Sequence, residues 1–159
     1  MRFHHESTYS APVGEVFAML TDQSFREQVC GQVKSSSHAV DVAAGPPVVV
    51  TVDQDQPVRN VPPYAAKLVG EIVRIHQIET WADQARATLD LTIPGKPGQL
   101  TATRTLTEHD GVTTDSIDGE LKVNIPLVGG KLEQVIGGLL TGFLAAESEV
   151  GATWLSGVG

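Results

Sequence analysis

Arg104 is the residue whose position in the sequence most clearly suggests buried chemistry. It shares strand parity with Leu100 and Leu106, which places it on the apolar face of a predicted strand. A buried guanidinium needs an anionic partner. Asp115 is the nearest candidate, because it shares parity with Leu121 on the next predicted strand. The partner is either this carboxylate or the acid group of a ligand. The alternative is an arginine near a strand end that reaches solvent or forms a structural pair.

Arg74 and His76 are cavity candidates only if their strand presents one particular face to the core. If the hairpin at "WADQ" has a two-residue loop, Thr80 pairs with Ala85, and the side chains that point inward are Ile72, Arg74, His76 and Ile78. If the loop has an odd number of residues, the side chains that point inward are Val73, Ile75, Gln77, Glu79 and Trp81. The two cases differ because a slip of one residue in the pairing moves every side chain to the other face. In the first case His76 is a possible acid or base inside a cavity. In the second it lies at the rim or surface.

The sequence lacks the motifs of common cofactor and metal sites. It contains no Gly-x-Ser-x-Gly elbow, no Walker loop and no Gly-x-Gly-x-x-Gly fingerprint. His4 and His5 are adjacent on a predicted strand and point to opposite faces, and the other histidines show no ligand spacing. Cys30 has no neighbouring base in the sequence, so we predict a small buried apolar residue rather than a nucleophile. We therefore predict no cofactor and no metal.

Composition indicates one folded domain over residues 1–159. Hydrophobic residues make up 41% and charged residues 19%, with a formal net charge of −8. The negative charge disfavours nucleic acid and anionic lipid surfaces as partners. The N-terminus lacks the apolar region of a secretory signal, and "VIGGLLTGFLAA" is too short to span a bilayer. We expect a cytoplasmic protein without stable membrane insertion.

The elements that position these residues follow from periodicity and turn chemistry. Residues 2–10 alternate as a strand, and two short helices follow, starting near Pro12 and at Asp22. Six more strands are predicted, at residues 33–42, 47–55, 71–81, 84–93, 99–109 and 112–125. Those at 84–93 and 99–109 have one apolar and one polar face, which is typical of an antiparallel sheet. The insert at residues 60–70 is predicted to be a short helix or a lid, and Tyr64 in it either gates a cavity or anchors the loop by packing.

A long C-terminal helix is predicted from Leu127 to Trp154. Its apolar stripe is Leu132, Val135, Ile136, Leu139, Phe143, Ala146, Val150 and Trp154. Gly137, Gly138 and Gly142 interrupt this helix, although each interior glycine costs about 1 kcal/mol relative to alanine. Either the sheet approaches the helix closely there, or the missing side chains leave room for a ligand.

This order of elements resembles the helix-grip fold of the START-like superfamily, which includes the birch pollen allergen family and polyketide cyclases. "STYSAPVGEVFAMLTDQSFREQVC" looks like the opening strand and corner helices of that superfamily. "IPLVGGKLEQVI" and "ESEVGATWL", with "KLVG" and "ETW", are similar to an actinobacterial family known as a domain of unknown function. The resemblance implies an α+β fold in which a curved seven-stranded antiparallel sheet grips the long helix and leaves a cavity between them.

The resemblance implies two functions, and a third hypothesis does not depend on it; the sequence leaves all three open. The first is binding or transport of a hydrophobic or amphipathic small molecule, lipid-like or polycyclic. The second is a cyclase or aromatase, with Arg74, His76, Arg104 and Asp115 as its polar groups. The third is a protein-interaction module that needs no ligand, with a homodimer as one form. The candidate ligand-binding residues are Tyr64, Arg74, His76, Leu89, Leu91, Arg104, Asp115, Leu121, Leu139 and Phe143. We predict no catalytic residue and expect a binding protein rather than an enzyme.

Overall fold

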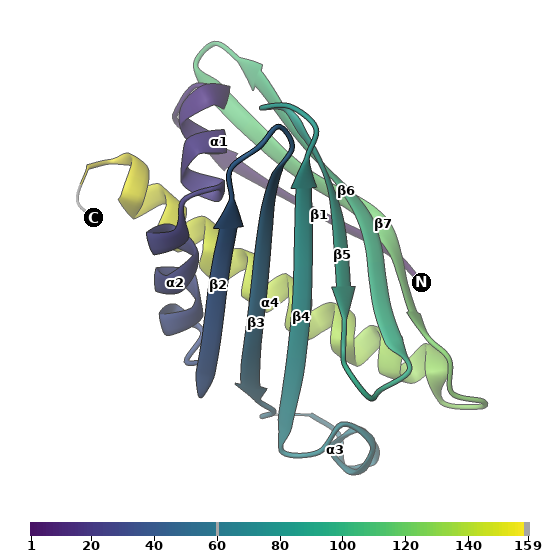
Figure 1. The fold of residues 1–159 in the computed structure, drawn as a ribbon. Helices are drawn as coiled ribbons and strands as arrows, with labels where there is room; N and C mark the ends of the chain where they lie inside the picture. The colour runs from purple at the N-terminus through teal and green to yellow at the C-terminus, as the bar shows by residue number, and fades with distance from the viewer. Residues whose placement is uncertain (60, 158–159) are drawn as a thin grey trace.

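One curved sheet and a long helix across it make up most of the molecule (Figure 1). The computed structural model describes residues 1–59 and 61–157. The elements are β1 (Arg2–Tyr9), α1 (Val13–Leu20), α2 (Gln23–Gln32), β2 (Ser37–Ala43), β3 (Val48–Pro57), α3 (Pro63–Val69), β4 (Ile72–Trp81), β5 (Arg86–Thr92), β6 (Gly98–His109), β7 (Val112–Val123) and α4 (Gly129–Leu155). The predicted α+β helix-grip architecture is confirmed.

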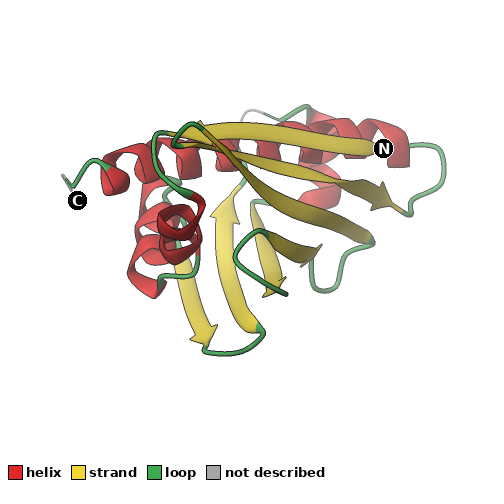
Figure 2. Ribbon diagram, turned by 90° about the horizontal axis from the view of Figure 1, so that it is seen from above, coloured by secondary structure: helices red, strands yellow, loops and turns green. Residues whose placement is uncertain are grey.

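The sheet is antiparallel between all neighbouring strands and has the order β1-β7-β6-β5-β4-β3-β2. The first strand therefore pairs with the last one, and the two short helices bridge from β1 to the opposite edge at β2. Figure 2 shows the bend of the sheet and the long helix running along it. Since α4 contacts β1 and β7 as well as α1 and α2, one helix holds both ends of the sheet together.

Local sequence signals set several boundaries. The Asp22 carboxylate accepts a hydrogen bond from the Phe25 amide at 3.1 Å and caps α2. The β6–β7 hairpin turns at Asp110 and Gly111, which have φ values of 51° and 78°. Such positive φ values are why the turn contains Asp and Gly. The predicted insert forms α3, and Asn60, with which the prediction began, lies outside the described residues.

The odd-count alternative for β4 is correct. Trp81 pairs with Ala87, and the Ala82 amide donates to the Arg86 carbonyl, which leaves three residues at the tip of the loop. The inner face of β4 therefore carries Val73, Ile75, Gln77, Glu79 and Trp81. The alternative that turned Arg74 and His76 inward is wrong, because the odd loop shifts the pairing by one residue.

The stripe predicted for α4 needs a correction. Leu139 is 45% exposed, and the buried positions along the helix are Gly129, Leu132, Ile136, Gly137, Leu140, Leu144, Glu147 and Gly151. The helix is rotated from the prediction, and Gly151 is one of the positions where it packs closely on its neighbours. A Cβ at that residue would lie 2.7 Å from Tyr9 Cε1 and 3.1 Å from Met19 Cε.

Within the described residues, α4 is the helix long and apolar enough to cross a bilayer by composition, with a mean hydropathy of 1.2. About 28% of its apolar stretch is buried, so one face of the helix packs on the rest of the domain. It packs on the sheet and on α1 and α2, and it buries the Glu147 carboxylate against two arginines.

Two apolar clusters make up the core. The first apolar cluster lies between the sheet and the N-terminal half of α4 and includes Leu91, Leu100 and Ile136. The second apolar cluster includes Phe25 of α2 and Trp81 of β4, and it lies between α1, α2 and the other end of the sheet. Each is a distinct hydrophobic environment, and the charged groups described next lie where the two meet.

Candidate functional site

Five buried charged side chains from five different elements form one ion cluster. They are Arg26 of α2, Glu79 of β4, Arg104 of β6, Asp115 of β7 and Glu147 of α4. None is more than 3% exposed. We call this group the ion cluster.

Arg104 is the centre of the ion cluster. Its Nε donates to Asp115 Oδ1 at 2.9 Å, and its Nη2 donates to Asp115 Oδ2 at 2.5 Å. Its Nη1 donates to Glu79 Oε2 at 3.1 Å, and Nη2 also contacts Glu147 Oε1. The planar guanidinium thus joins two strands of the sheet to the long helix, which a lysine ammonium would not do with this geometry.

Arg26 completes the cluster from the helical side. Its Nη2 donates to Glu79 Oε1 at 2.8 Å, and its Nη1 donates to Glu147 Oε2 at 3.1 Å. Its Nε donates to the Leu20 carbonyl at 2.7 Å, which ties α2 to the end of α1. Glu79 and Glu147 are therefore each held between two arginines.

Three carboxylates face two guanidiniums, which gives the ion cluster a formal charge of −1. Burial alone would raise the pKa of Glu79, but the positive charges of Arg26 and Arg104 outweigh burial and hold that pKa below its usual value. Despite its burial, Arg104 has a pKa well above the usual arginine value because Asp115, Glu147 and Glu79 surround it. Both groups are ionised at neutral pH.

His5 lies beside the ion cluster on the inner face of β1. Burial lowers its pKa, against the opposing effect of Asp115 and Glu147. It is therefore neutral at pH 7.

A cavity of about 240 Å³ lies between the sheet and α4, within the first apolar cluster. It is lined by Val33, Gln54, Gln56, Pro57, Val58, Val69, Val73, Ile75, Gln77, Leu91, Ile93, Val135, Ile136, Leu139, Leu140, Gly142 and Phe143. Leu139 and Gly142 are its exposed lining residues, so the opening to solvent lies beside α4. All other lining residues except the three glutamines are also apolar.

The three glutamines form the polar part of this lining. Gln54 and Gln77 are 3% and 5% exposed, and they lie on the inner faces of the adjacent strands β3 and β4. The Gln56 Nε2 donates to Gln54 Oε1 at 2.6 Å, and the Gln77 Nε2 donates to Glu79 Oε2 at 2.8 Å. Gln77 thus connects the cavity to the ion cluster.

The glycines of α4 have different surroundings. A Cβ at Gly137 would lie 2.5 Å from Met1 Cε and 3.7 Å from Leu121 Cδ2, so this glycine permits close packing. Gly142 lines the cavity, and a Cβ there would meet nothing within 4 Å. Gly138 is exposed and has open space, but it is not part of the lining. Close packing therefore accounts for Gly137, and room for a ligand at Gly142 stays a prediction.

The structure brings three of the ten predicted binding residues to the cavity. Leu91, Leu139 and Phe143 line it. Leu89 and Leu121 are buried in the first apolar cluster but are not part of the lining. Arg104 and Asp115 pair with each other inside the ion cluster, as the sequence suggested, and they too lie outside the lining.

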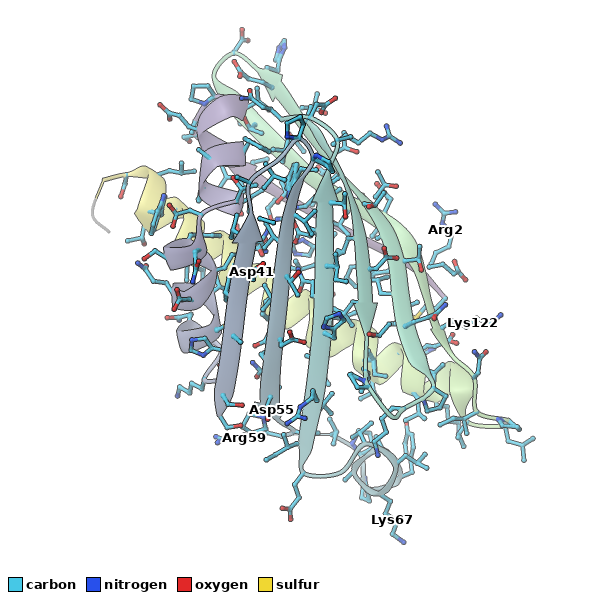
Figure 3. The ribbon with its side chains drawn as sticks, viewed as in Figure 1. Arg2, Asp41, Asp55, Arg59, Lys67 and Lys122 are labelled. Atoms are coloured by element: carbon cyan, nitrogen blue, oxygen red, sulfur yellow. The ribbon has the colours of Figure 1, made fainter. Side chains whose placement is uncertain are left out.

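The other three predicted residues lie outside the cavity. Tyr64 is 39% exposed on α3, where the Lys131 Nζ lies 5.9 Å from its ring centroid. Arg74 and His76 lie on the outer face of the sheet, the latter with its Nδ1 2.5 Å from Asp53 Oδ1. Arg74 binds the Asp55 carboxylate through two hydrogen bonds of 2.8 and 3.1 Å. Figure 3 labels Asp55 near the end of β3.

The sequence analysis placed Gln77 and Glu79 inward only in the odd-count alternative for their strand, and it missed Arg26, Gln54, Gln56 and Glu147. Two of them carried a usable signal. Arg26 precedes Val29 and Cys30 by three and four residues, which puts it on the buried face of its helix. Glu147 follows Leu144 by three residues, which gives it the same orientation on α4.

Comparison with protein families decides the relationship of the chain. A family model described as "Protein of unknown function (DUF2505)" matches residues 4–155. The chain belongs to the DUF2505 family. No curated protein sequence matches it significantly.

Solved structures place this DUF2505 chain among helix-grip proteins. TTHA0849 from Thermus thermophilus is 18% identical with a TM-score of 0.64, over 94% of this chain and 96% of that one. The Zhui aromatase/cyclase from a Streptomyces species is 11% identical with a TM-score of 0.61, over 96% and 91%. Norcoclaurine synthase from Thalictrum flavum is 11% identical with a TM-score of 0.58, over 98% and 86%. The fold is that of the START-like superfamily, which the sequence resemblance had implied.

Proposed function

We propose that this protein binds a hydrophobic or amphipathic small molecule in the cavity between the sheet and α4. The observation that carries the proposal is the space of about 240 Å³ lined almost entirely by hydrocarbon. It is larger than an engineered apolar cavity of ~150 Å³ that takes up benzene. A folded protein normally fills such a volume with side chains, whereas here Gly142 of α4 is part of the lining and has open space at its Cβ position.

Removal of apolar ligand surface from water would drive binding. At about 25 cal/mol per Å², a ligand that buries about 200 Å² of apolar surface gains roughly 5 kcal/mol. The loss of translational and rotational freedom offsets part of this gain. Affinity in the micromolar range therefore requires a good fit and some additional polar recognition.

A cyclase or aromatase is the alternative suggested by the name of one structural neighbour. Acid–base catalysis needs a titratable group within hydrogen-bond reach of the substrate. The described cavity lining consists of apolar and amide groups. The closest carboxylate in the hydrogen-bond chain, Glu79, is reached through the Gln77 amide and already binds both arginines. This chemistry supports recognition and burial over proton transfer.

Native mass spectrometry followed by organic extraction is the first experiment. A hydrophobic molecule that co-purifies with the protein would give the ligand class directly. The same protein is then titrated with N-phenyl-1-naphthylamine, a neutral probe whose fluorescence rises in apolar surroundings.

A pair of variants on α4 locates the probe. Gly142→Phe adds a large side chain to the cavity lining and is expected to weaken probe binding at least tenfold. Gly138→Phe is the matched control, because the same side chain on the same helix has open space outside the lining. Equal affinities in the two variants, or no binding to the unmodified protein, would contradict the proposal. A clean protein mass together with a stable dimer would instead favour a protein-interaction role.

A further inference from the structure

Gln77 presents its amide oxygen to the cavity in a fixed orientation. Its Nε2 donates to Glu79 Oε2, and Glu79 is an ionised acceptor held by Arg26 and Arg104. A flipped amide would place Oε1 against that carboxylate, so the observed orientation is the favourable one. Among the described residues, Gln77 Oε1 has no hydrogen-bond donor.

Gln54 presents the opposite group. Its Oε1 accepts from Gln56 Nε2 at 2.6 Å, and no acceptor for its Nε2 occurs in the described part of the chain. The fully enclosed polar atoms without a partner in that part are Tyr9 Oη and Trp81 Nε1. Since neither amide atom is one of these, Gln54 Nε2 and Gln77 Oε1 are both partly accessible, and both residues line the cavity.

The two glutamines are diagonal neighbours on one face of the sheet. Val52 pairs with Gln77 and Gln54 pairs with Ile75, so Gln54 and Gln77 are offset by two residues on adjacent strands. Diagonal neighbours lie roughly 7–8 Å apart. At this separation, two glutamine side chains on one face are close enough for their amides to bind the same small polar group.

We infer that the cavity selects a ligand whose inner end carries a neutral group that both donates and accepts a hydrogen bond, such as a hydroxyl, a phenol or an amide. This inference rests on the proposed function and specifies its ligand class. The ligand donates to Gln77 Oε1 and accepts from Gln54 Nε2, while its hydrocarbon part fills the apolar remainder of the cavity.

Charged end groups fit this arrangement poorly. A carboxylate satisfies Gln54 Nε2 but meets the lone pairs of Gln77 Oε1, and behind Gln77 the ion cluster carries a formal charge of −1. An ammonium satisfies Gln77 but leaves the Gln54 donor facing another donor. The described lining offers no opposite charge to either group, and burial of an unpaired charge is costly.

Four naphthalenes of one size test the inference at pH 7 by fluorescence or calorimetric titration. They are naphthalene, 2-naphthol, naphthalene-2-carboxamide and 2-naphthoate. The naphthol and the carboxamide are expected to bind roughly tenfold more tightly than naphthalene, and 2-naphthoate is expected to bind more weakly than naphthalene.

Leucine variants then assign the preference to the two amides. Gln77→Leu and Gln54→Leu are each expected to reduce the preference for 2-naphthol over naphthalene by roughly three- to tenfold, with naphthalene affinity kept or improved. Gln99→Leu is the control, because Gln99 is exposed and outside the lining. Since Gln77 also binds Glu79, Gln54→Leu provides a test that does not disturb the ion cluster.

The results separate this inference from the proposed function. Suppose that naphthalene binds, that Gly142→Phe abolishes its binding, and that 2-naphthol binds no more tightly than naphthalene. The proposed binding function is then supported, and the inferred selectivity for a neutral polar group is overturned. Tightest binding of 2-naphthoate would overturn the selectivity in the same way. If none of the four compounds binds, the proposed function and the inferred selectivity are both overturned.

Discussion

Arg104 and Asp115 form a bidentate ion pair inside the sheet, from adjacent strands and without exposure to solvent. The Nε–Oδ1 and Nη2–Oδ2 distances are 2.9 and 2.5 Å. Arg104 pairs across the strands with Ile117, and Asp115 pairs with Leu106, so the two charged residues are diagonal neighbours on the inner face. The ion pair lies between the first and the second apolar cluster, since Ala102 belongs to the first and Leu106 to the second.

Loss of Arg104 is predicted to destabilise the protein strongly. Arg104→Met leaves Asp115 without its described cation and removes one of two cations from Glu79 and Glu147. Removing one partner of a buried pair costs about 3–5 kcal/mol, and urea unfolding measures it. Arg74→Met is the matched control, because Arg74 is 68% exposed in its pair with Asp55, and its unfolding midpoint should change little. Similar midpoints for both variants would contradict this role of the ion cluster.

Stability is predicted to fall in acid partly through Glu79. Because its pKa is lower in the folded state than the usual 4.5, its stabilising effect is complete above about pH 4.5 and is lost as the pH falls through the folded value. Each proton of difference between the folded and unfolded states changes the unfolding free energy by about 1.4 kcal/mol per pH unit. Urea unfolding of Glu79→Gln should therefore show a shallower pH dependence below pH 4.5 than the unmodified protein.

A control and a second titrating group complete that experiment. Glu149→Gln removes an exposed carboxylate of α4 and should leave the acid slope unchanged. His5 has a lowered pKa, so its contribution to stability is complete above its unfolded value near 6.5 and is lost as the pH falls from there through the folded value. This effect of His5 is expected to be the same in the unmodified protein and in both variants. An acid slope of Glu79→Gln equal to that of the unmodified protein would show that Glu79 does not titrate as described.

Alanine at two glycines of α4 is predicted to have opposite effects. Gly142→Ala gains helix propensity of about 1 kcal/mol, and its Cβ would meet no atom within 4 Å. Gly151→Ala gains the same propensity, but its Cβ would collide with the buried Tyr9 ring at 2.7 Å. Thermal unfolding should show a higher midpoint for the first variant and a lower one for the second. Equal shifts would mean that α4 does not approach β1 as closely at Gly151 as described.

The Cys30 thiol is predicted to be unreactive in the folded protein. It is 1% exposed, and burial raises its pKa to about 11, so little thiolate is present at pH 8. A thiol reagent such as dithionitrobenzoate should react only as fast as the protein unfolds. Guanidinium chloride provides the fully reactive control. Rapid reaction of the folded protein would show that α2 opens locally.

The ion cluster shows how far sequence patterns reach. The alternation of apolar and polar residues placed Arg104 and Asp115 on the inner faces of two neighbouring strands. The two strands form a hairpin with a short turn, so their pairing could be read from the local sequence. Arg26 and Glu147 are 121 residues apart and meet only when α4 packs against α2. The helical spacing of each residue indicated its buried face, but it could not indicate the partner.

By itself, the sequence determined the order of the elements, the faces of β5 and β6, and the helix-grip fold through its family resemblance. The tertiary structure decided which face of β4 is buried, because a three-residue loop tip rather than a two-residue one reverses Gln77 and His76. It also decided the rotation of α4, and with it the cavity beside Gly142. Alternation and helical periodicity are properties of one segment, whereas a cavity is a volume left between segments, and its size depends on how closely their surfaces approach.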